Sequence, residues 1–296
     1  MQTTTRAKVF LKRYAPAPVF EAIRFIADKT LLKIVPLFFK FKISDFRQVY
    51  FREIYFDRHT FKIEINPSNG YLDAQIHAHG LYEPHIIETM YQHIKPGNTC
   101  IDIGANIGHH TILMSHFVGE KGHVYAYEPI PYLRDQMARS LAINSIHNVT
   151  IHDVALSDKE GEMALFLREG NIGGSSFVSG VDTNELPVRV TTLDRQHTEK
   201  VDFMKIDVEG YEYHVLLGGK QLIETYRPTI IFEWSPIYYR IHDESHAKLI
   251  LEFFKKREYR LIDIENNNKL ITHLDEFINE FDDGLRSQTN ILAIPL

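Results

Sequence analysis

The chain has 296 residues, of which 44% are hydrophobic and 24% charged, and its formal net charge is −6. This length and ordinary composition fit one large α/β domain with an appendage, or two domains, and exclude a fibrous or low-complexity protein. The single cysteine, Cys100, excludes an internal disulfide and suits a reducing compartment. It falls in an expected buried strand, which favours an inert core thiol over a nucleophile.

Residues 1–42 form a basic segment. They hold nine Lys or Arg residues against two acids, a net charge of +7, so the rest of the chain carries −13. Apolar positions in residues 18–29 follow a helical rhythm, and the apolar run 31–41 is too short and too interrupted to span a bilayer. We expect residues 1–50 to be a basic, apolar helical appendage that packs on the main domain or on a second subunit.

Other roles for this appendage stay open. A basic amphipathic segment can rest on the anionic inner face of a membrane, so residues 1–45 are also a candidate for peripheral membrane contact or homo-oligomer formation. No cleavable signal is recognisable, and we expect a cytoplasmic protein. Because no basic stripe continues into the acidic body, we expect no nucleic-acid partner.

Residues 51–98 predict a β-hairpin and a helix that lead into the core. Residues 61–65 alternate apolar and charged side chains, residues 67–70 give a turn signal, and Leu72–His79 is expected to return as the second strand. His77 and His79 would share a face of that strand, but no third ligand is near in sequence, which favours solvated histidines over a metal site. A helix is expected through Ile86 and Ile94, ending before Pro96 and Gly97.

From residue 99 to 296 the chain alternates strands and helices, which predicts a parallel sheet covered on both faces. The expected strands are 99–103, 123–127, 149–152, 202–207, 228–234, 259–264 and 288–294. The expected helices are 107–117, 131–143, 211–224 and 245–256. Strands at 162–168 and 187–192 interrupt this alternation and flank a glycine-rich loop over 170–176.

A tight glycine turn follows the first strand of this region. In Asp102-Ile103-Gly104-Ala105-Asn106-Ile107-Gly108 the backbone can approach a ligand closely, and the next helix offers unpaired N–H groups at its N-terminus. The two glycines are four residues apart, so the dinucleotide fingerprint G-x-G-x-x-G is absent. This counts against an NAD-dependent oxidoreductase or epimerase, which remains an alternative.

Acids recur at the carboxyl ends of the expected strands, where ligands of open α/β sheets bind; they are Asp102, Glu128, Asp153, Asp207 and Glu233. Glu128 lies 24 residues after Gly104, a spacing suited to accept hydrogen bonds from both hydroxyls of a ribose. Asp153 is expected to accept from an adenine amine, with the backbone of Val154 reading the ring edge. Asp102 either holds the glycine turn or attracts a cationic ligand such as a sulfonium.

Several ordered blocks resemble the FkbM family of methyltransferases that depend on S-adenosyl-L-methionine (SAM), over about residues 60–240. They are Gly80-Leu81-Tyr82-Glu83, the glycine turn, Tyr127-Glu128-Pro129, residues 153–158 and Met204-Lys205-Ile206-Asp207-Val208-Glu209-Gly210-Tyr211-Glu212. The resemblance implies a seven-stranded, Rossmann-like class I methyltransferase fold and S-adenosyl-L-homocysteine (SAH) as product. It implies O-methylation of a carbohydrate or glycosylated metabolite. The implied cofactor contacts are Glu83, Asp102, Gly104, Ala105, Asn106, Gly108, Glu128, Asp153, Val154 and Asp207.

Methyl transfer from a sulfonium depends mainly on placing the acceptor oxygen, and a poorly nucleophilic hydroxyl is helped by a general base or a metal. We expect Asp207 near donor and acceptor, and Glu209 or Glu233 as base or acceptor-positioning group. Glu209 could instead complement a helix dipole, and Glu233 could be a backbone-bonded strand-end acid. Lys205 either points into the site or, as we prefer, pairs with one of these carboxylates.

The acceptor is expected to be a small molecule or a glycan. Asn171, Ser175 and Ser176 lie in a loop that suits a flexible substrate cover, although an ordinary exposed loop is the alternative. Trp234 either stacks on a sugar or packs in the core, and His214 reads as a surface histidine rather than a base. No ligand spacing calls for a metal, and a metal requirement stays open. A noncatalytic methyltransferase-like assembly module is the last alternative.

Overall fold

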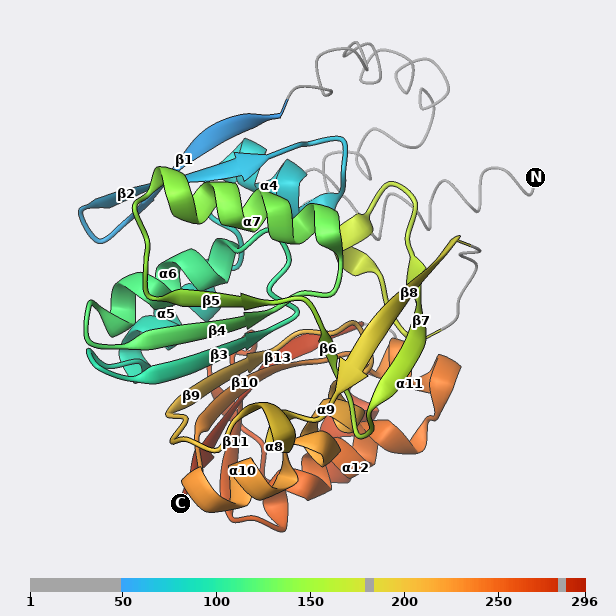
Figure 1. Ribbon diagram of the computed structural model, residues 1–296. Coiled ribbons are helices and arrows are strands. Elements are labelled where there is room, and N and C mark those ends of the chain that lie inside the picture. Colours follow the sequence, from blue (N-terminus) through green and yellow to red (C-terminus); the bar gives the residue numbers. More distant parts are fainter. Residues whose placement is uncertain (1–48, 179–183, 282–285) are drawn as a thin grey trace, which may run out of the picture. The chain divides into compact units, whose positions relative to one another are not determined.

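The computed structural model describes residues 49–178, 184–281 and 286–296, which belong to one compact unit. The appendage expected over residues 1–50 lies almost entirely outside these described residues. The unit is built around one large sheet, with helices on both of its faces and a smaller sheet beside it (Figure 1).

The large sheet has eight strands in the order β12-β11-β13-β10-β9-β3-β4-β5. Their bounds are β3 (Thr99–Ile103), β4 (His123–Tyr127), β5 (Val149–His152), β9 (Phe203–Ile206), β10 (Thr229–Trp234), β11 (Tyr259–Asp263), β12 (Lys269–Leu270) and β13 (Thr289–Pro295). β13 is antiparallel to both neighbours, β10 and β11, whereas β5, β4, β3, β9 and β10 pair in parallel. The chain runs outward from β3 to β5 and then returns to β9, so the strand order reverses between β3 and β9.

The expected sheet of seven strands is confirmed with one addition. The short β12 pairs with the edge strand β11 and raises the number of strands to eight. The remaining seven have the strand order of a class I methyltransferase sheet, including the antiparallel strand inserted next to the edge.

The two faces of the sheet bury different sets of helices. Cys100 and Val124 face the core formed with α5 (Pro84–His93), α6 (His109–Val118) and α7 (Pro131–Ile143). Ile101, the residue after Cys100 in β3, faces the opposite core, because successive strand residues point to opposite faces. Phe232 of β10 faces this second core as well. The helices of that second core are α8 (Leu193–Gln196), α9 (Glu212–Gly218), α10 (Lys220–Tyr226), α11 (Pro236–His242), α12 (Ser245–Lys255) and α13 (Leu274–Asn279).

The hairpin before the core differs from the expectation. β2 (His59–Ile65) pairs with the upstream β1 (Tyr50–Phe56), through a two-residue turn whose residues Asp57 and Arg58 both have positive φ. The predicted strand Leu72–His79 is wrong, because this segment is the helix α4 (Tyr71–His79). Its buried residues Asp73 and Ile76 are three apart, which is the spacing of one helix face.

The predicted long helix over 211–224 is divided into α9 and α10 at Gly218 and Gly219. A Cβ atom at Gly218 would overlap the carbonyl oxygen of Ser157, so the chain approaches its neighbour too closely there for any other residue. The predicted strands of the excursion are confirmed as β7 (Gly161–Leu167) and β8 (Asn184–Thr191). They form a separate sheet with the two-residue β6 (Ala155–Leu156), in the order β6-β8-β7.

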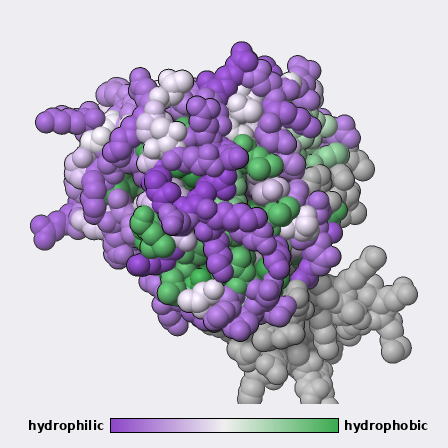
Figure 2. All heavy atoms as spheres, turned by 90° about the horizontal axis from the view of Figure 1, so that it is seen from below, coloured by the Kyte–Doolittle hydropathy of each residue, from purple (hydrophilic) through white to green (hydrophobic). Residues whose placement is uncertain are grey.

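The surface seen from below is mostly hydrophilic, with hydrophobic side chains gathered in smaller patches (Figure 2). Within the described part of the chain, no helix is both long and apolar enough to cross a membrane.

Candidate active site

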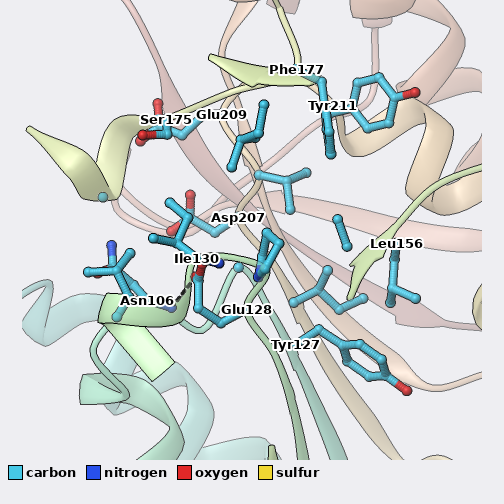
Figure 3. Close-up of a pocket in the computed structure, with 18 residues that line it drawn as sticks. Asn106, Tyr127, Glu128, Ile130, Leu156, Ser175, Phe177, Asp207, Glu209 and Tyr211 are labelled. Carbon is cyan, nitrogen blue, oxygen red and sulfur yellow. Dashed lines mark hydrogen bonds between the residues drawn. The ribbon is translucent and has the colours of Figure 1, made fainter. Parts of the chain in front are cut away.

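A pocket lies at the carboxyl ends of β3, β4 and β9, where the strand order reverses. The small sheet and the helical turn η2 (Ile172–Gly174) contribute the other side of its lining. Figure 3 shows Asn106 and Glu128 at the lower edge of the pocket and Ser175 and Glu209 at the upper edge. The complete lining is Ile103, Gly104, Asn106, Tyr127, Glu128, Pro129, Ile130, Leu133, Ala155, Leu156, Leu165, Gly173, Ser175, Phe177, Asp207, Val208, Glu209 and Tyr211.

The predicted glycine turn forms one wall of this pocket. The backbone N–H groups of Gly104 and Ala105 both donate to the carbonyl oxygen of Tyr127, at 3.0 Å each. Gly104 has a φ of 80°, and a Cβ atom there would overlap the carbonyl oxygen of Asp207. Only glycine therefore lets the turn lie against the end of β9. Gly108, at a φ of 84°, precedes the first residue of α6 and packs closely on Met137.

Glu128 follows β4 and is 4% exposed. Its Oε2 accepts from the Asn106 backbone N–H at 2.9 Å, the dashed line of Figure 3, and its Oε1 accepts from that of Ile130 at 2.8 Å. Burial raises the pKa of Glu128 to about 7, while these two hydrogen bonds oppose the rise. Each carboxylate oxygen has room for a second donor, so the pair can accept from two adjacent hydroxyls.

Lys205 pairs with a carboxylate, as expected, and is almost fully buried. Its Nζ donates to Oδ2 of Asp207 at 2.8 Å. It lies beside Asp102 in the register of β9 and β3. Burial lowers the pKa of Lys205, but the carboxylates around it more than compensate and raise it overall. Asp102 is buried off the pocket lining and accepts from the Thr111 hydroxyl at 2.6 Å, which ties β3 to α6.

The turn after β9 brings Asp207 and Glu209 to the pocket in a different way from the one expected. The chain is not extended beyond Ile206, and Glu209 adopts a left-handed conformation with a φ of 53°. Both side chains nevertheless line the pocket. Burial and the Asp207 carboxylate raise the pKa of Glu209 to about 7.

Glu212 holds this turn and was not singled out by the sequence reasoning. Its Oε1 accepts from the backbone N–H groups of Val208, at 3.1 Å, and Gly210, at 3.2 Å. Its Oε2 accepts from the Tyr239 hydroxyl at 3.0 Å. The sequence signal that could have identified Glu212 is an acid in the first turn of a helix that directly follows a glycine turn.

Glu83 and Glu233 lie off the lining, in the buried polar cluster around Lys205. Glu83 precedes α5, and its Oε1 accepts from the Asn290 side chain at 3.4 Å. Glu233, within β10, accepts from the Gln288 side chain at 2.9 Å and has no partner for its Oε2. Burial and then the Asp207 carboxylate raise the pKa of both groups, that of Glu83 to about 7.

Asp153 and Val154 do not line the pocket either. The Asp153 carboxylate is exposed and forms an ion pair with Arg189 at 2.6 Å, while Val154 packs against the core behind the sheet. The chain turns after β5, and the next two residues, Ala155 and Leu156, reach the lining instead.

Trp234 and His214 are also away from the lining. Trp234 is fully buried, its indole N–H donates to the Ala247 carbonyl at 3.0 Å, and its ring packs on Phe277. It is therefore a core residue, and its ring is not available to stack on a sugar. His214 lies 3.3 Å from the Asp158 carboxylate and stacks on Tyr211.

The loop over residues 171–176 lies over the pocket and is held there by hydrogen bonds. Gly173 and Ser175 line the pocket, and a Cβ atom at Gly173 would overlap the Asn106 side chain. Oδ1 of Asn171 accepts from the Tyr71 backbone at 3.0 Å, and Oγ of Ser176 donates to the Glu209 carbonyl at 2.6 Å. The loop thus connects the glycine turn, α4 and the turn after β9.

Among the described residues, no three or more His, Cys, Asp or Glu side chains lie together in a group that could hold a metal ion. His77 and His79 lie two residues apart on α4 and therefore on different faces of the helix. Cys100 is buried, which raises the pKa of its thiol well above the usual value.

The sheet order, the glycine turn and the acid after the second parallel strand define a class I SAM-dependent methyltransferase. The model of the family described as the methyltransferase FkbM domain matches residues 102–261, more than half of the chain. The chain belongs to this family, as its sequence motifs indicated. A second model, for protein-L-isoaspartate(D-aspartate) O-methyltransferase, matches residues 43–158.

Individual relatives are distant. A protein-L-isoaspartate O-methyltransferase of Fervidobacterium nodosum is 30% identical over 36% of this chain and 54% of its own length. Methyltransferase sdnD of Sordaria araneosa is 26% identical over 59% of this chain and 82% of its own. The chain thus spans about half the length of the first of these curated relatives. Among solved structures, an FkbM methyltransferase from Methylobacillus flagellatus KT has 14% identity and a TM-score of 0.44, over 75% of this chain and 59% of that one.

The chemistry of the pocket fits the family's methyl donor, SAM. Glu128 offers two carboxylate oxygens to vicinal hydroxyls, and Ile130, Leu133 and Leu156 supply apolar surface suited to a flat purine. Asp207 and Glu209 place negative charge on the side where a sulfonium would be favoured. SAM is therefore the cofactor that the family and the pocket support.

Proposed function

We propose that the protein transfers a methyl group from SAM to a hydroxyl oxygen of a carbohydrate or glycosylated metabolite. The observation that carries this proposal is the acidic side of the pocket, where Asp207 and Glu209 line the wall and the buried Lys205 is paired with Asp207. Such a wall supplies proton acceptors to neutral hydroxyls and repels anionic acceptors.

The donor half of the pocket is assigned by the same chemistry. Glu128 would accept from the two ribose hydroxyls, and the glycine turn from Gly104 to Asn106 would contact the cofactor through its backbone. Ile130 and Leu156 would supply apolar surface to the adenine. Asp207, paired with Lys205, would favour the positive charge of the sulfonium.

In the reaction SAM supplies an electrophilic methyl group, and this chain's residues orient and deprotonate the acceptor. The Glu209 carboxylate accepts the hydroxyl proton as the acceptor oxygen becomes nucleophilic. With its pKa near 7, Glu209 has the basicity that general-base catalysis favours at neutral pH. Glu233 contributes from the buried cluster rather than from the lining, because a negative charge on Glu209 and one on Glu233 disfavour each other.

Methylation of a protein carboxyl group is the second candidate. It is favoured by the isoaspartate methyltransferase model and by the relative that is 30% identical. The matched residues 43–158 end before β9 and therefore leave out Asp207 and Glu209. A carboxylate acceptor would carry its own negative charge to that acidic wall, which is why we place the hydroxyl first.

The test is transfer of radiolabelled methyl from SAM to three acceptor pools: neutral glycans and glycosylated metabolites, an isoaspartyl peptide, and RNA. We expect label in the first pool, with kcat reduced at least 100-fold in Glu209→Gln, the size of a lost general base. The exposed Glu162→Gln is the matched control and should keep wild-type kcat. Label confined to the peptide or the RNA would reject the hydroxyl assignment.

A further inference from the structure

Glu209 is fixed in place by residues outside the sheet that holds the cofactor turn. Its carbonyl accepts from the Ser176 hydroxyl at 2.6 Å. Ser176 is itself bound to β7, because its backbone exchanges two hydrogen bonds with Phe166. The small sheet therefore reaches across the pocket and determines where the Glu209 backbone lies.

The carboxylate of Glu209 is held separately, from α11. The Tyr238 hydroxyl donates to this carboxylate. The same hydroxyl accepts from Nη1 of Arg168 at 2.9 Å. The Arg168 guanidinium also lies over the Tyr238 ring, 5.6 Å from its centre. A Cβ atom at Gly210 would overlap the Tyr238 side chain, so the turn and α11 are in close contact.

The groups around the Glu209 carboxylate divide into two sets. Asp207 at the end of β9, Glu212 on α9 and Glu233 on β10 are carboxylates, and each disfavours a second negative charge nearby. Tyr238 on α11 and Arg168 after β7 act in the opposite sense, through a hydrogen bond and a positive charge. Loss of either should raise the pKa of Glu209, so that less of it is the carboxylate that can accept a proton.

We propose that Arg168 and Tyr238 are positioning residues for the transfer: Arg168 orients Tyr238, and the Tyr238 hydroxyl holds Glu209 as a charged carboxylate directed at the acceptor. This rests on the proposed function of Glu209. In the assisted step, Glu209 takes the proton as the acceptor O–H bond breaks. An electron pair of the acceptor oxygen forms the new C–O bond to the methyl carbon, and the electron pair of the broken C–S bond remains on sulfur.

The first test needs no acceptor. In full-length protein with saturating SAH, the Glu209 carboxyl carbon is titrated by ¹³C NMR, with its signal assigned from Glu209→Gln. We expect the pKa of Glu209 to rise by about one unit in Tyr238→Phe, the size of a lost hydrogen bond to a charged group. Arg168→Met should raise it as well. Tyr259→Phe, which removes a buried hydroxyl bond to Pro228 far from the pocket, should not.

An unchanged pKa of Glu209 in folded Tyr238→Phe would overturn the proposal. If that variant does not fold, Arg168→Met decides in the same way, because the Arg168 side chain reaches Tyr238 from a loop rather than from the core. Once an acceptor is identified, the acidic limb of the pH profile of kcat should shift to higher pH by the same amount, while the KM for SAM stays constant. Shifted titration without any hydroxyl methylation would leave the positioning role intact and reject the proposed function.

Discussion

Several residues of the pocket are held in place by the protein before a ligand binds. Glu128 is the clearest case, because two backbone N–H groups orient its carboxylate before any ligand arrives. Gly104 is a second case, because the absence of a side chain lets the glycine turn lie against the end of β9. Preorganised backbone of this kind loses little freedom when a ligand binds.

The glycine turn gives the first prediction. Gly104→Ala should weaken SAM binding at least tenfold and lower the free energy of unfolding by about 2 kcal/mol or more, since it combines a positive φ with a backbone overlap. Gly119→Ala is the matched control, because Gly119 also has a positive φ but open space around it. Its cost in stability should be about 1–3 kcal/mol from backbone strain alone, with SAM affinity unchanged. Calorimetry and urea denaturation measure both effects, and an equal loss of SAM affinity in the two variants would contradict the account.

Buried acids make stability depend on pH. Burial, their first cause, raises the pKa of Glu83, Glu128, Glu209 and Glu212 from 4.5 to about 7. The folded protein therefore holds protons that the unfolded chain has released, and the free energy of unfolding falls as the pH rises from about 4.5 to about 7. One group with such a shift changes stability by roughly 3 kcal/mol.

Glu212→Gln isolates one of these groups, because the amide oxygen can still accept from Val208 and Gly210. We expect the loss of stability between pH 5 and pH 8 to be smaller in this variant by about 2 kcal/mol. Urea denaturation at the two pH values measures this difference. The exposed Glu162→Gln should leave the dependence unchanged, and an identical dependence in Glu212→Gln would rule out the assigned cause.

At the scale of elements, α4 shows where periodicity read from sequence fails. Residues 72–79 carry no strong pattern, and the turn signal before them favoured a returning strand. The actual partner of β2 is β1, reached through Asp57 and Arg58. These residues lack the Asn-Gly or Asp-Gly signature of such turns, so local sequence held no clear mark of the hairpin.

Asp73 is what fixes α4 in place. Its Oδ1 accepts from the Asn66 backbone at 2.6 Å and from the Gln136 side chain at 2.9 Å, which joins α4 to the end of β2 and to α7. Asp73→Ala should lower the free energy of unfolding by about 2 kcal/mol, because the part-buried Asn66 N–H loses its acceptor and the buried Gln136 amide loses one of its two. The exposed His79→Ala on the same helix should change it by less than about 0.5 kcal/mol. Similar values for the two variants would mean that α4 is not anchored through Asp73.

Strand alternation was better evidence than residue type in β10. Ile230, Phe232 and Trp234 share the face that packs on α12, and Glu233 points to the other face. Period-two spacing alone assigns Trp234 to the core. Asp153 has no such signal, because its direction depends on how the chain turns between β5 and β6.

At the scale of the whole molecule, the parallel sheet and its glycine turn were predictable from the sequence, and the residues on the other side of the pocket were not. Alternating strands and helices, the glycine turn and Glu128 all lie in continuous blocks of sequence, so local reasoning reached them. Arg168 and Tyr238 act through a contact between elements distant in the chain. Only the folded structure brings them to Glu209.

The most direct test of the account is calorimetric titration of the full chain with SAM, SAH and NAD. We expect SAM and SAH to bind and NAD not to bind. Glu128→Ala should weaken SAM binding at least tenfold, whereas Asp153→Asn, at the next strand end but paired with Arg189 outside the pocket, should stay within twofold of the wild type. Undiminished SAM binding in Glu128→Ala, or binding of NAD in place of SAM, would contradict the assignment of this pocket.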